Sequence, residues 1–430
     1  MSNVSFAELG LSDAMLSFCS SRGFEKPTPI QSKSIPLILK TERDGVFLAP
    51  TGTGKTAAFG LPLLDKLDSS RSDTQICVLV PTRELAMQVT KELTSFNPSL
   101  SKSIVPIYGG GDMRQQLRAL KEKPSIVVGT PGRIMDHLNR KSLVIRNLSC
   151  LVLDEADEML NMGFVDDIET ILEHVNADRR ILLFSATMPK KIRSLIKKYL
   201  SNPETVEGDR AKASFSMVEQ IYYDVAQKEK RTALTRIFAF EQDLHALVFA
   251  QTRREVDFLA QWLQQKGYKT KAIHGDIPQK QRELVLKDFR EKKIRVLIAT
   301  DVAARGIDIP SLTLVVNYDL PQNPEAYVHR IGRTGRAGQK GRAVTLVTSK
   351  EYRSWSFIQR IVKFPIKKKA LPSAKEVSVI KKNQFFDDLC QFVGKCDHDH
   401  GFKDWAQKLL ADNEPDELVA MLMGYCYKRS

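Results

Sequence analysis

One eight-residue run of the chain, Ala-Pro-Thr-Gly-Thr-Gly-Lys-Thr at 49–56, has the composition and spacing of a phosphate-binding loop. It follows a short apolar run and precedes a helix-compatible stretch, and its first position carries alanine where the general pattern has glycine. Gly52 and Gly54 let backbone N–H groups turn toward a phosphate, and a helix N-terminus adds the positive end of its dipole. Lys55 can then reach the β- and γ-phosphates, while the Thr56 hydroxyl can bind the Mg²⁺ ion that bridges them. The loop therefore predicts a site for a nucleoside triphosphate and Mg²⁺.

A second run with catalytic potential is Asp-Glu-Ala-Asp, which begins at Asp154 directly after an apolar stretch. Open α/β sheets bind their ligands at the carboxyl ends of their strands, where these carboxylates would lie. Asp154 is expected to hold Mg²⁺ through water, because this ion dehydrates reluctantly. Glu155 is expected to polarise the water that attacks the γ-phosphate. Asp157 is expected to turn toward the next strand end, where Ser185 and Thr187 offer two hydroxyls.

Short apolar runs recur in two groups and predict the elements that must hold these motifs. The runs lie at 46–48, 76–80, 126–128, 151–153 and 181–184, and then at 221–223, 246–249, 296–298, 314–316 and 343–347. Because they are apolar throughout rather than alternating, they are typical of parallel sheets covered by helices on both faces. We expect an α/β protein with two tandem doubly wound domains, of which only the first carries a phosphate-binding loop.

Changes in composition along the chain predict the domain boundaries. The first α/β domain is expected at 1–207 and the second at 217–365. The intervening 208–216 is small, polar and without apolar periodicity, which is typical of a linker. From 366–430 a basic connector leads into apolar residues at helical spacing, which predicts a small helical tail.

The charge balance indicates an anionic partner. The chain has 65 Lys and Arg against 51 Asp and Glu, a net charge of +14, and nucleic acid is the first candidate because basic surface displaces counterions from a phosphate backbone. No apolar run approaches the roughly 18 residues of a membrane span, and the start of the chain does not read as a secretory signal. We expect a cytoplasmic protein whose six cysteines are reduced thiols. A zinc site is disfavoured, because C-x5-C-x-H-x-H is not a usual ligand spacing; that spacing belongs to Cys390, Cys396, His398 and His400.

Together, the phosphate-binding loop, the Asp-Glu-Ala-Asp run and the Ser-Ala-Thr run at 185–187 resemble the DEAD-box family of RNA-dependent ATPases. The resemblance extends over roughly residues 6 to 350, with 300–308 and 329–336 as further matching motifs. It implies two tandem RecA-like domains and an ATP-dependent RNA helicase that unwinds short duplexes locally. Two other readings stay open: an ATP-gated RNA clamp that serves as an assembly platform, and a DNA translocase.

The resemblance also assigns residues to the ATP site. Gln31, whose amide can both donate and accept hydrogen bonds, would select adenine, with an aromatic side chain covering the base. Arg333 and Arg336 would reach the γ-phosphate across a domain cleft as arginine fingers, and Asp308 would contact the ribose. The remaining nucleotide-binding positions are Phe6, Phe24, Thr51, Gly52, Thr53, Gly54, Lys55 and Thr56, and the positions that couple ATP to RNA are Asp157, Ser185, Thr187 and His329.

RNA contacts are expected where helices begin after strands. Free backbone N–H groups and an arginine converge there, so an RNA phosphate can be held without its base being read. A preference for RNA over DNA rests on the resemblance alone. The predicted RNA-binding residues are Pro81, Thr82, Arg83, Gly110, Thr130, Pro131, Gly132, Arg133, Arg253, Asp276, Gln279, Arg282, Thr300 and Gly306.

The tail has two interpretations. Its apolar residues could pack onto the second domain, or they could form a dimer. The segments 372–376 and 415–420 resemble the helical dimerisation module of some bacterial DEAD-box helicases, in which an RNA-binding domain often follows. We expect a homodimer through 371–430. This stretch is acidic overall, so the basic charge belongs to the two α/β domains.

Overall fold

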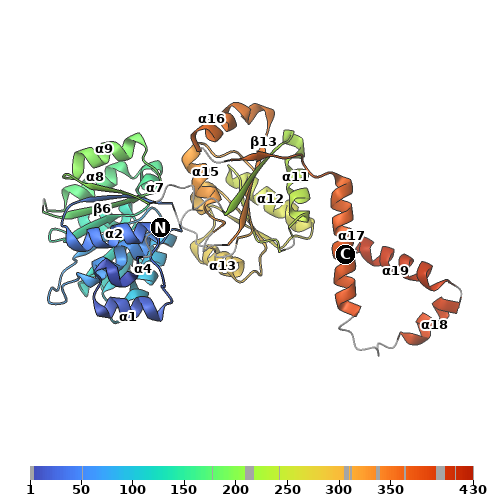
Figure 1. The fold of residues 1–430 in the computed structure, drawn as a ribbon, viewed down its shortest axis with the longest axis horizontal. Helices are drawn as coiled ribbons and strands as arrows, with labels where there is room; N and C mark the ends of the chain where they lie inside the picture. The colour runs from blue at the N-terminus through green and yellow to red at the C-terminus, as the bar shows by residue number, and fades with distance from the viewer. Residues whose placement is uncertain are drawn as a thin grey trace.

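The computed structural model shows two α/β domains side by side, with a helical tail that extends from the second (Figure 1). It describes residues 4–50, 52–176, 178–208, 217–241, 243–304, 309, 312–335, 339–362, 365–393, 402–411 and 413–429.

The first domain is built on a parallel sheet with strand order β3-β4-β2-β5-β6-β1-β7. Its strands are β1 (Gly45–Leu48), β2 (Ile76–Leu79), β3 (Ile104–Ile107), β4 (Ile126–Gly129), β5 (Cys150–Leu153), β6 (Arg180–Ser185) and β7 (Glu204–Glu207). Its helices are α1 (Asp13–Ser21), α2 (Pro29–Lys40), α3 (Lys55–Asp65), α4 (Arg83–Phe96), α5 (Met113–Lys121), α6 (Pro131–Asn139), α7 (Ala156–Asn161), α8 (Val165–Glu173) and α9 (Lys190–Tyr199).

Helices cover both faces of this sheet because its central strands are apolar on both sides. On β2, Val78 packs with α1 to α4, whereas Cys77 and Leu79 face α6 to α9. Each of these three side chains is fully buried. A parallel sheet needs this two-sided burial, so the predicted doubly wound fold is confirmed.

The second domain repeats the topology of the first, strand for strand. Its parallel sheet has the order β10-β11-β9-β12-β13-β8-β14, which is the first order with every strand number raised by seven. Its strands are β8 (Val218–Asp224), β9 (Ala246–Phe249), β10 (Thr270–Ile273), β11 (Val296–Ala299), β12 (Leu314–Asn317), β13 (Gly341–Val347) and β14 (Lys367–Lys368). Its helices are α11 (Lys230–Ala239), α12 (Arg253–Gln265), α13 (Gln279–Arg290), α14 (Asp301–Ala304), α15 (Pro324–Ile331) and α16 (Tyr352–Val362).

One predicted boundary needs correction. The second domain was expected to end at 365, but β14 pairs with β8 as the last strand of the second sheet. Lys369 also forms an ion pair with Glu219 on β8, and Leu371 packs against the core of this domain. The basic connector is therefore partly an edge strand, whose exposed lysines gave no apolar signal.

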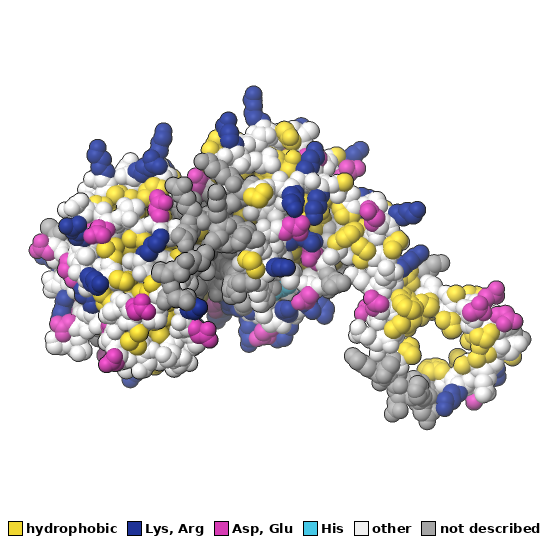
Figure 2. All heavy atoms as spheres, in the orientation of Figure 1, with side chains coloured by type: hydrophobic (Ala, Val, Ile, Leu, Met, Phe, Trp, Pro, Cys, Tyr) yellow, Lys and Arg dark blue, Asp and Glu magenta, His cyan; other side chains and the backbone are white. Residues whose placement is uncertain are grey.

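The tail consists of α17 (Ala374–Val393), α18 (Lys403–Ala411) and α19 (Pro415–Arg429). Figure 2 shows hydrophobic side chains gathered where these helices face one another. Many of these side chains are more than half exposed, with Phe392 at 65% and Trp405 at 69%. Among the described tail residues, only Leu418 is buried. Among the described tail helices, α17 contacts the second domain: Gln384, in the middle of this helix, donates to the Ala239 carbonyl on α11. The described tail leaves most of its apolar surface uncovered.

Within the described part of the chain, no helix is long and apolar enough to span a bilayer. The described residues also contain no cluster of three or more potential metal-ligating side chains of the His, Cys, Asp or Glu type. Cys390 is exposed on α17, and the other three residues of the disfavoured zinc spacing lie outside the described residues.

Candidate ATP site and RNA-binding surface

The phosphate-binding loop joins β1 to α3 with the geometry that its glycines predict. Gly52 and Gly54 have φ values of +79° and +83°, a backbone conformation that residues with a Cβ rarely adopt. Gly54 is the N-cap of α3, and Lys55 is its first residue. The Lys55 side chain is buried, and its Nζ has no hydrogen-bond partner among the described residues. A buried ammonium without a partner is costly, so this position fits an anionic phosphate.

Side chains from the start of α2 hold this loop in place. The Thr28 hydroxyl donates to the Thr53 carbonyl at 2.8 Å, and the Gln31 amide Nε2 donates to the Gly54 carbonyl at 3.1 Å. Gln31 Oε1 accepts from the Thr28 N–H at 2.9 Å, which completes a capping box. Gln31 therefore fixes the loop, a contact that was not predicted from the sequence. Its amide retains a second N–H and a second lone pair for adenine, so adenine selection stays a prediction.

The two aromatic residues predicted to cover the base pack on each other. The rings of Phe6 and Phe24 are stacked with centroids 6.0 Å apart. Phe6 is buried in the core of the first domain, and Phe24 is partly buried against that core. One face of this stack is therefore used for packing within the domain.

The first two acidic residues after β5 lie beside Lys55 at the carboxyl end of the sheet. Asp154 is buried and accepts a hydrogen bond from the Glu155 N–H at 2.9 Å. Burial raises the pKa of Asp154 to about 6, while the positive charge of Lys55 acts in the opposite direction. Glu155 has φ +52°, a left-handed conformation that costs energy in a residue with a Cβ. Strain of this kind is concentrated at functional sites.

Asp157 connects this tetrapeptide to the end of β6. Its Oδ2 accepts from both the backbone N–H and the hydroxyl of Thr187, at 2.9 and 2.7 Å. The predicted contact with Thr187 is confirmed, but the contact with Ser185 is wrong, because the Ser185 hydroxyl donates to the Thr187 carbonyl at 2.6 Å instead. Burial alone would raise the pKa of Asp157, but hydrogen bonds from His329 and Thr187 outweigh it and hold the pKa well below its usual value.

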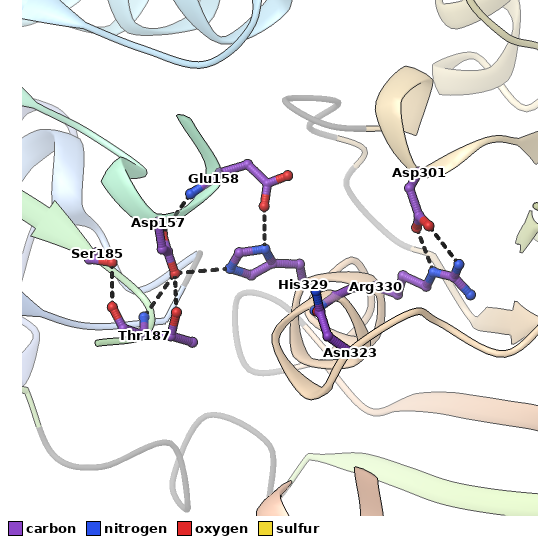
Figure 3. Close-up of polar contacts among 9 residues, drawn as sticks. Asp157, Glu158, Ser185, Thr187, Asp301, Asn323, His329 and Arg330 are labelled. Atoms are coloured by element: carbon purple, nitrogen blue, oxygen red, sulfur yellow. Dashed lines mark hydrogen bonds and ion pairs between the residues drawn. The ribbon is translucent and has the colours of Figure 1, made fainter. Parts of the chain in front are cut away.

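His329 on α15 brings the second domain onto these carboxylates, as Figure 3 shows. Its Nδ1 lies 2.8 Å from Glu158 Oε2, and its Nε2 lies 3.5 Å from Asp157 Oδ2. All three side chains are at most 13% exposed. The structure therefore brings together His329 and Asp157, two of the residues predicted to couple ATP to RNA, and adds Glu158. Glu158 was not predicted from the sequence, because an acid in the first turn of a helix usually interacts only with the helix dipole.

The same helix leads to Arg333, which is the described member of the predicted pair Arg333 and Arg336. The Asn323 side chain caps α15 by accepting from the Ala326 N–H at 2.7 Å. Arg330 forms two hydrogen bonds with Asp301, at 2.6 and 2.7 Å, which anchor the helix to its own domain. Arg333 follows the helix, is buried, and lines a small cavity that also includes His329 and the first domain's Glu158. Four predicted residues lie outside the described residues: Thr51, Gly306, Asp308 and Arg336.

In the first domain, the predicted RNA residues cluster at neighbouring helix starts. β2 and β4 are adjacent, so the N-termini of α4 and α6 lie at the same sheet edge. The chain enters α4 through Pro81 and Thr82, and the N-cap Thr82 accepts from the Leu85 N–H. The start of α6 is formed by its N-cap Thr130, its first residue Pro131 and then Gly132. Arg83 donates to the Gly110 carbonyl at 3.3 Å, and Arg133 donates to Gln116 at 3.4 Å.

In the second domain, three adjacent strand ends carry the corresponding residues. Arg253 begins α12 after β9, and it forms an ion pair with Asp276, which follows β10. Thr300 follows β11, and its N–H donates to the Ile273 carbonyl at 3.4 Å. Gln279 and Arg282 lie on the first turn of α13. Arg282 donates to the Ala303 carbonyl at 2.7 Å.

The two sets of RNA residues meet at the domain boundary. Arg83 of the first domain donates to Glu283 of the second at 2.8 Å. Arg282 of the second domain lies 2.9 Å from Glu84 of the first. Both arginines were predicted from the sequence but neither glutamate was, because these contacts depend on how the two domains pack together.

Comparison with known proteins gives family matches in both domains. Residues 28–195 match the family described as DEAD/DEAH box helicase, and residues 229–338 match the helicase conserved C-terminal domain. The chain is 49% identical over 371 residues to the DEAD-box ATP-dependent RNA helicase CshA of Bacillus cereus, which covers 86% of this chain and 70% of that protein. It is 45% identical over 415 residues to the CshA of Geobacillus kaustophilus, covering 96% and 88%.

Solved structures agree with these matches. The yeast protein Dbp5 from S. cerevisiae, bound to RNA and ADP BeF3, has a TM-score of 0.80 at 32% identity, covering 88% of this chain and 99% of that one. Mss116p bound to ssRNA and AMP-PNP has a TM-score of 0.79 at 27% identity, covering 91% and 86%. The two tandem sheets therefore have the arrangement of RecA-like helicase domains.

Proposed function

The chain belongs to the DEAD-box family of ATP-dependent RNA helicases, and from this premise we propose that its two domains share one composite ATP site that closes on RNA and separates short duplexes locally. The observation that supports this most directly is His329 of the second domain, 2.8 Å from Glu158 and 3.5 Å from Asp157 of the first. This contact ties the Asp-Glu-Ala-Asp turn to the helix that leads to Arg333. Domain closure and completion of the site would then be one event.

We assign the binding of ATP phosphates to the loop of the first domain. Lys55 would neutralise the β- and γ-phosphates, with the N-terminus of α3 and the turn at Gly52 and Gly54 supplying N–H donors. The Thr56 hydroxyl and the Asp154 carboxylate are oxygen donors of the kind that Mg²⁺ prefers, so the residues fit this ion. When bound, Mg²⁺ would neutralise charge that develops on the phosphates.

The chemical step would use groups from both domains. Glu155 would accept the proton of the attacking water as it approaches the γ-phosphate. Arg333, with Arg336, would stabilise the charge on the transferred phosphoryl group from across the cleft. Because these arginines belong to the second domain, hydrolysis would depend on closure.

RNA would be held by its backbone along both domains. The N-termini of α4 and α6 and their arginines supply donors in the first domain, and Arg253, Gln279 and Arg282 supply them in the second. A closed pair of domains could hold one strand only along a fixed, bent path. A duplex bound there would be forced open over a short length, and hydrolysis would reset the domains.

Strand separation and RNA residence time together test this function. We expect the full chain to separate short RNA duplexes in the presence of ATP and to fail on long ones. Its ATP hydrolysis should be stimulated by RNA and far less by DNA. Long-lived RNA binding without strand separation would instead indicate an ATP-gated clamp, and equal stimulation by DNA would indicate a DNA translocase.

We further propose that the tail forms a homodimer. This proposal is supported by the exposed apolar side chains of α17 to α19, because contiguous apolar surface of this kind usually marks an interaction site. Replacing Val393 and Val419 by Asp should convert a dimer to a monomer in sedimentation. The matched control is Val144→Asp, an equally exposed valine in the first domain, which should leave the dimer intact. A wild-type chain that sediments as a monomer at high concentration contradicts the proposal.

We place this activity in the cytoplasm, where ATP and RNA are both available. The cysteines support this placement, since Cys19, Cys77 and Cys150 are free and buried rather than joined in disulfides. Cell fractionation of the source organism would test it.

A further inference from the structure

Two consecutive residues on each side of the domain boundary form crossed ion pairs. Arg83 and Glu84 begin α4 of the first domain, and Arg282 and Glu283 lie on α13 of the second. Arg83 Nη2 donates to Glu283 Oε1 at 2.8 Å, while Arg282 Nε lies 2.9 Å from Glu84 Oε1. Each domain thus contributes one cation and one anion, and each pair crosses the boundary.

Both arginines are among the residues assigned to RNA in the proposed function, on which this inference rests. Glu283 therefore lies where an RNA phosphate would otherwise meet Arg83. Glu84 contacts only the Nε of Arg282, so the other N–H groups of that guanidinium can still face RNA. Glu283 Oε1 also accepts from the Gln279 side-chain amide at 3.1 Å, which is a third residue assigned to RNA. Its carboxylate thus gathers donors from both domains, as a bound phosphate would.

The two pairs differ in their access to solvent. Arg282 and Glu84 are 13% and 10% exposed, so their pair is shielded. In the other pair, Arg83 is 16% exposed but Glu283 is 48% exposed. A half-exposed carboxylate can leave its partner at small cost, because water solvates it. A shielded carboxylate cannot leave without uncovering a buried charge.

Each arginine has other contacts that fix it in place without its glutamate. Arg83 donates to the Gly110 carbonyl and lies over the Tyr108 ring, 4.5 Å from its centroid. Arg282 donates to the Ala303 carbonyl at 2.7 Å. An arginine that loses its glutamate therefore stays oriented toward the boundary. A cavity of about 610 Å³ between α4 and α13, lined by Glu84 and Glu283 among others, leaves room for Glu283 to swing away.

We propose that Glu84 and Glu283 are positioning residues for RNA with opposite effects. Glu283 is an internal competitor: its carboxylate occupies Arg83 until an RNA phosphate displaces it. Glu84 aligns the domains: its shielded pair with Arg282 persists and keeps the RNA-binding residues of the two domains at a fixed relative position. RNA then exchanges one ion pair for another at Arg83, while the domains stay aligned through Arg282.

Removing each charge singly distinguishes these roles in the full chain. The probe is a fluorescein-labelled single-stranded RNA, with binding followed by anisotropy in the presence of a non-hydrolysable ATP analogue. Glu283→Gln should bind this RNA more tightly by about two- to fivefold, the range of an exposed ion pair. Glu84→Gln should bind it more weakly by roughly tenfold or more, because Arg282 loses a shielded partner.

Steady-state kinetics supply a readout that a general loss of structure would not mimic. In Glu283→Gln the RNA concentration for half-maximal ATP hydrolysis should fall while kcat at saturating RNA is unchanged. In Glu84→Gln this concentration should rise and kcat should fall as well, because closure is weakened. Thermal unfolding of Glu283→Gln should match the wild type to within a few degrees, on the order expected for a surface change. Each domain of Glu84→Gln should remain folded, because the pair that it loses lies between the domains.

A matched variant controls for simple removal of negative charge. Glu291→Gln changes the same residue type at the other end of α13, where Glu291 pairs with Lys293. It should leave RNA affinity unchanged. Equal tightening in Glu291→Gln, or weaker or unchanged binding in Glu283→Gln, overturns the competitor role. Unchanged or tighter RNA binding in Glu84→Gln overturns the aligning role of Glu84. A wild-type chain that binds no RNA would instead refute the proposed function itself.

Discussion

Replacing His329 by Ala should uncouple the two domains while leaving each one folded. The substitution removes the 2.8 Å contact with Glu158 and the 3.5 Å approach to Asp157. Both carboxylates are at most 4% exposed, so water cannot readily replace the histidine. A hydrogen bond to a charged group contributes about 1.5–3 kcal/mol. We therefore expect the free energy of domain closure to become less favourable by about 2–3 kcal/mol. This corresponds to a decrease of about 30- to 150-fold in the equilibrium constant for closure.

The assay is ATP hydrolysis as a function of RNA concentration. We expect RNA-stimulated turnover to fall by at least an order of magnitude, whereas binding of a fluorescent ATP analogue to the first domain stays near the wild-type value. Asp157 keeps both hydrogen bonds from Thr187, so its local structure should persist. His174→Ala is the matched control, since His174 is an exposed histidine at the end of α8 whose ring, among the described residues, hydrogen-bonds only to the Thr170 carbonyl. Normal stimulation by RNA in His329→Ala would show that His329 does not couple the two domains.

Three further predictions concern the first domain. Glu155→Gln should retain ATP binding but stop turnover and prolong the RNA complex, as followed by single-turnover hydrolysis and RNA dissociation; hydrolysis at the normal rate would remove Glu155 from its role. Gly54→Ala should abolish binding of a fluorescent ATP analogue, because the new Cβ would lie 2.3 Å from the Gln31 amide at a φ of +83°. Gly267→Ala is its control, with a φ of +85° and open space around the new Cβ, and it should cost about 1–2 kcal/mol of stability without affecting ATP binding. Chelation of divalent ions should abolish hydrolysis reversibly, and full activity in excess chelator would contradict the roles given to Thr56 and Asp154.

The interior of the fold could be predicted from the sequence, but its edges could not. Central strands such as β2 and β11 are buried on both faces, so unbroken apolar runs identify them. The strands β3, β7, β10 and β14 were missed because they are edge strands. β7 reads Glu-Thr-Val-Glu and alternates between partly buried and exposed, while β3 contains a proline, which edge strands tolerate.

Site residues were predictable where local sequence fixes their direction. The phosphate-binding loop, the start of α4 and the contact of Asp157 with Thr187 follow from strand order and helix starts. The role of Gln31 in holding Gly54 depends on how α2 packs against the loop. Glu84, Glu158 and Glu283 could not be predicted, because their partners come from the other domain. An isolated acidic residue in a helix usually marks a solvated face.

The most direct test of the composite site is single-turnover ATP hydrolysis by Arg333→Ala at saturating RNA. Arg333 belongs to the second domain, yet it lines a cavity with Glu158 of the first. We expect this variant to bind ATP and RNA but to hydrolyse ATP about a thousandfold more slowly than the wild type. A variant that hydrolyses ATP at the wild-type rate would show that the second domain contributes no cation to the reaction.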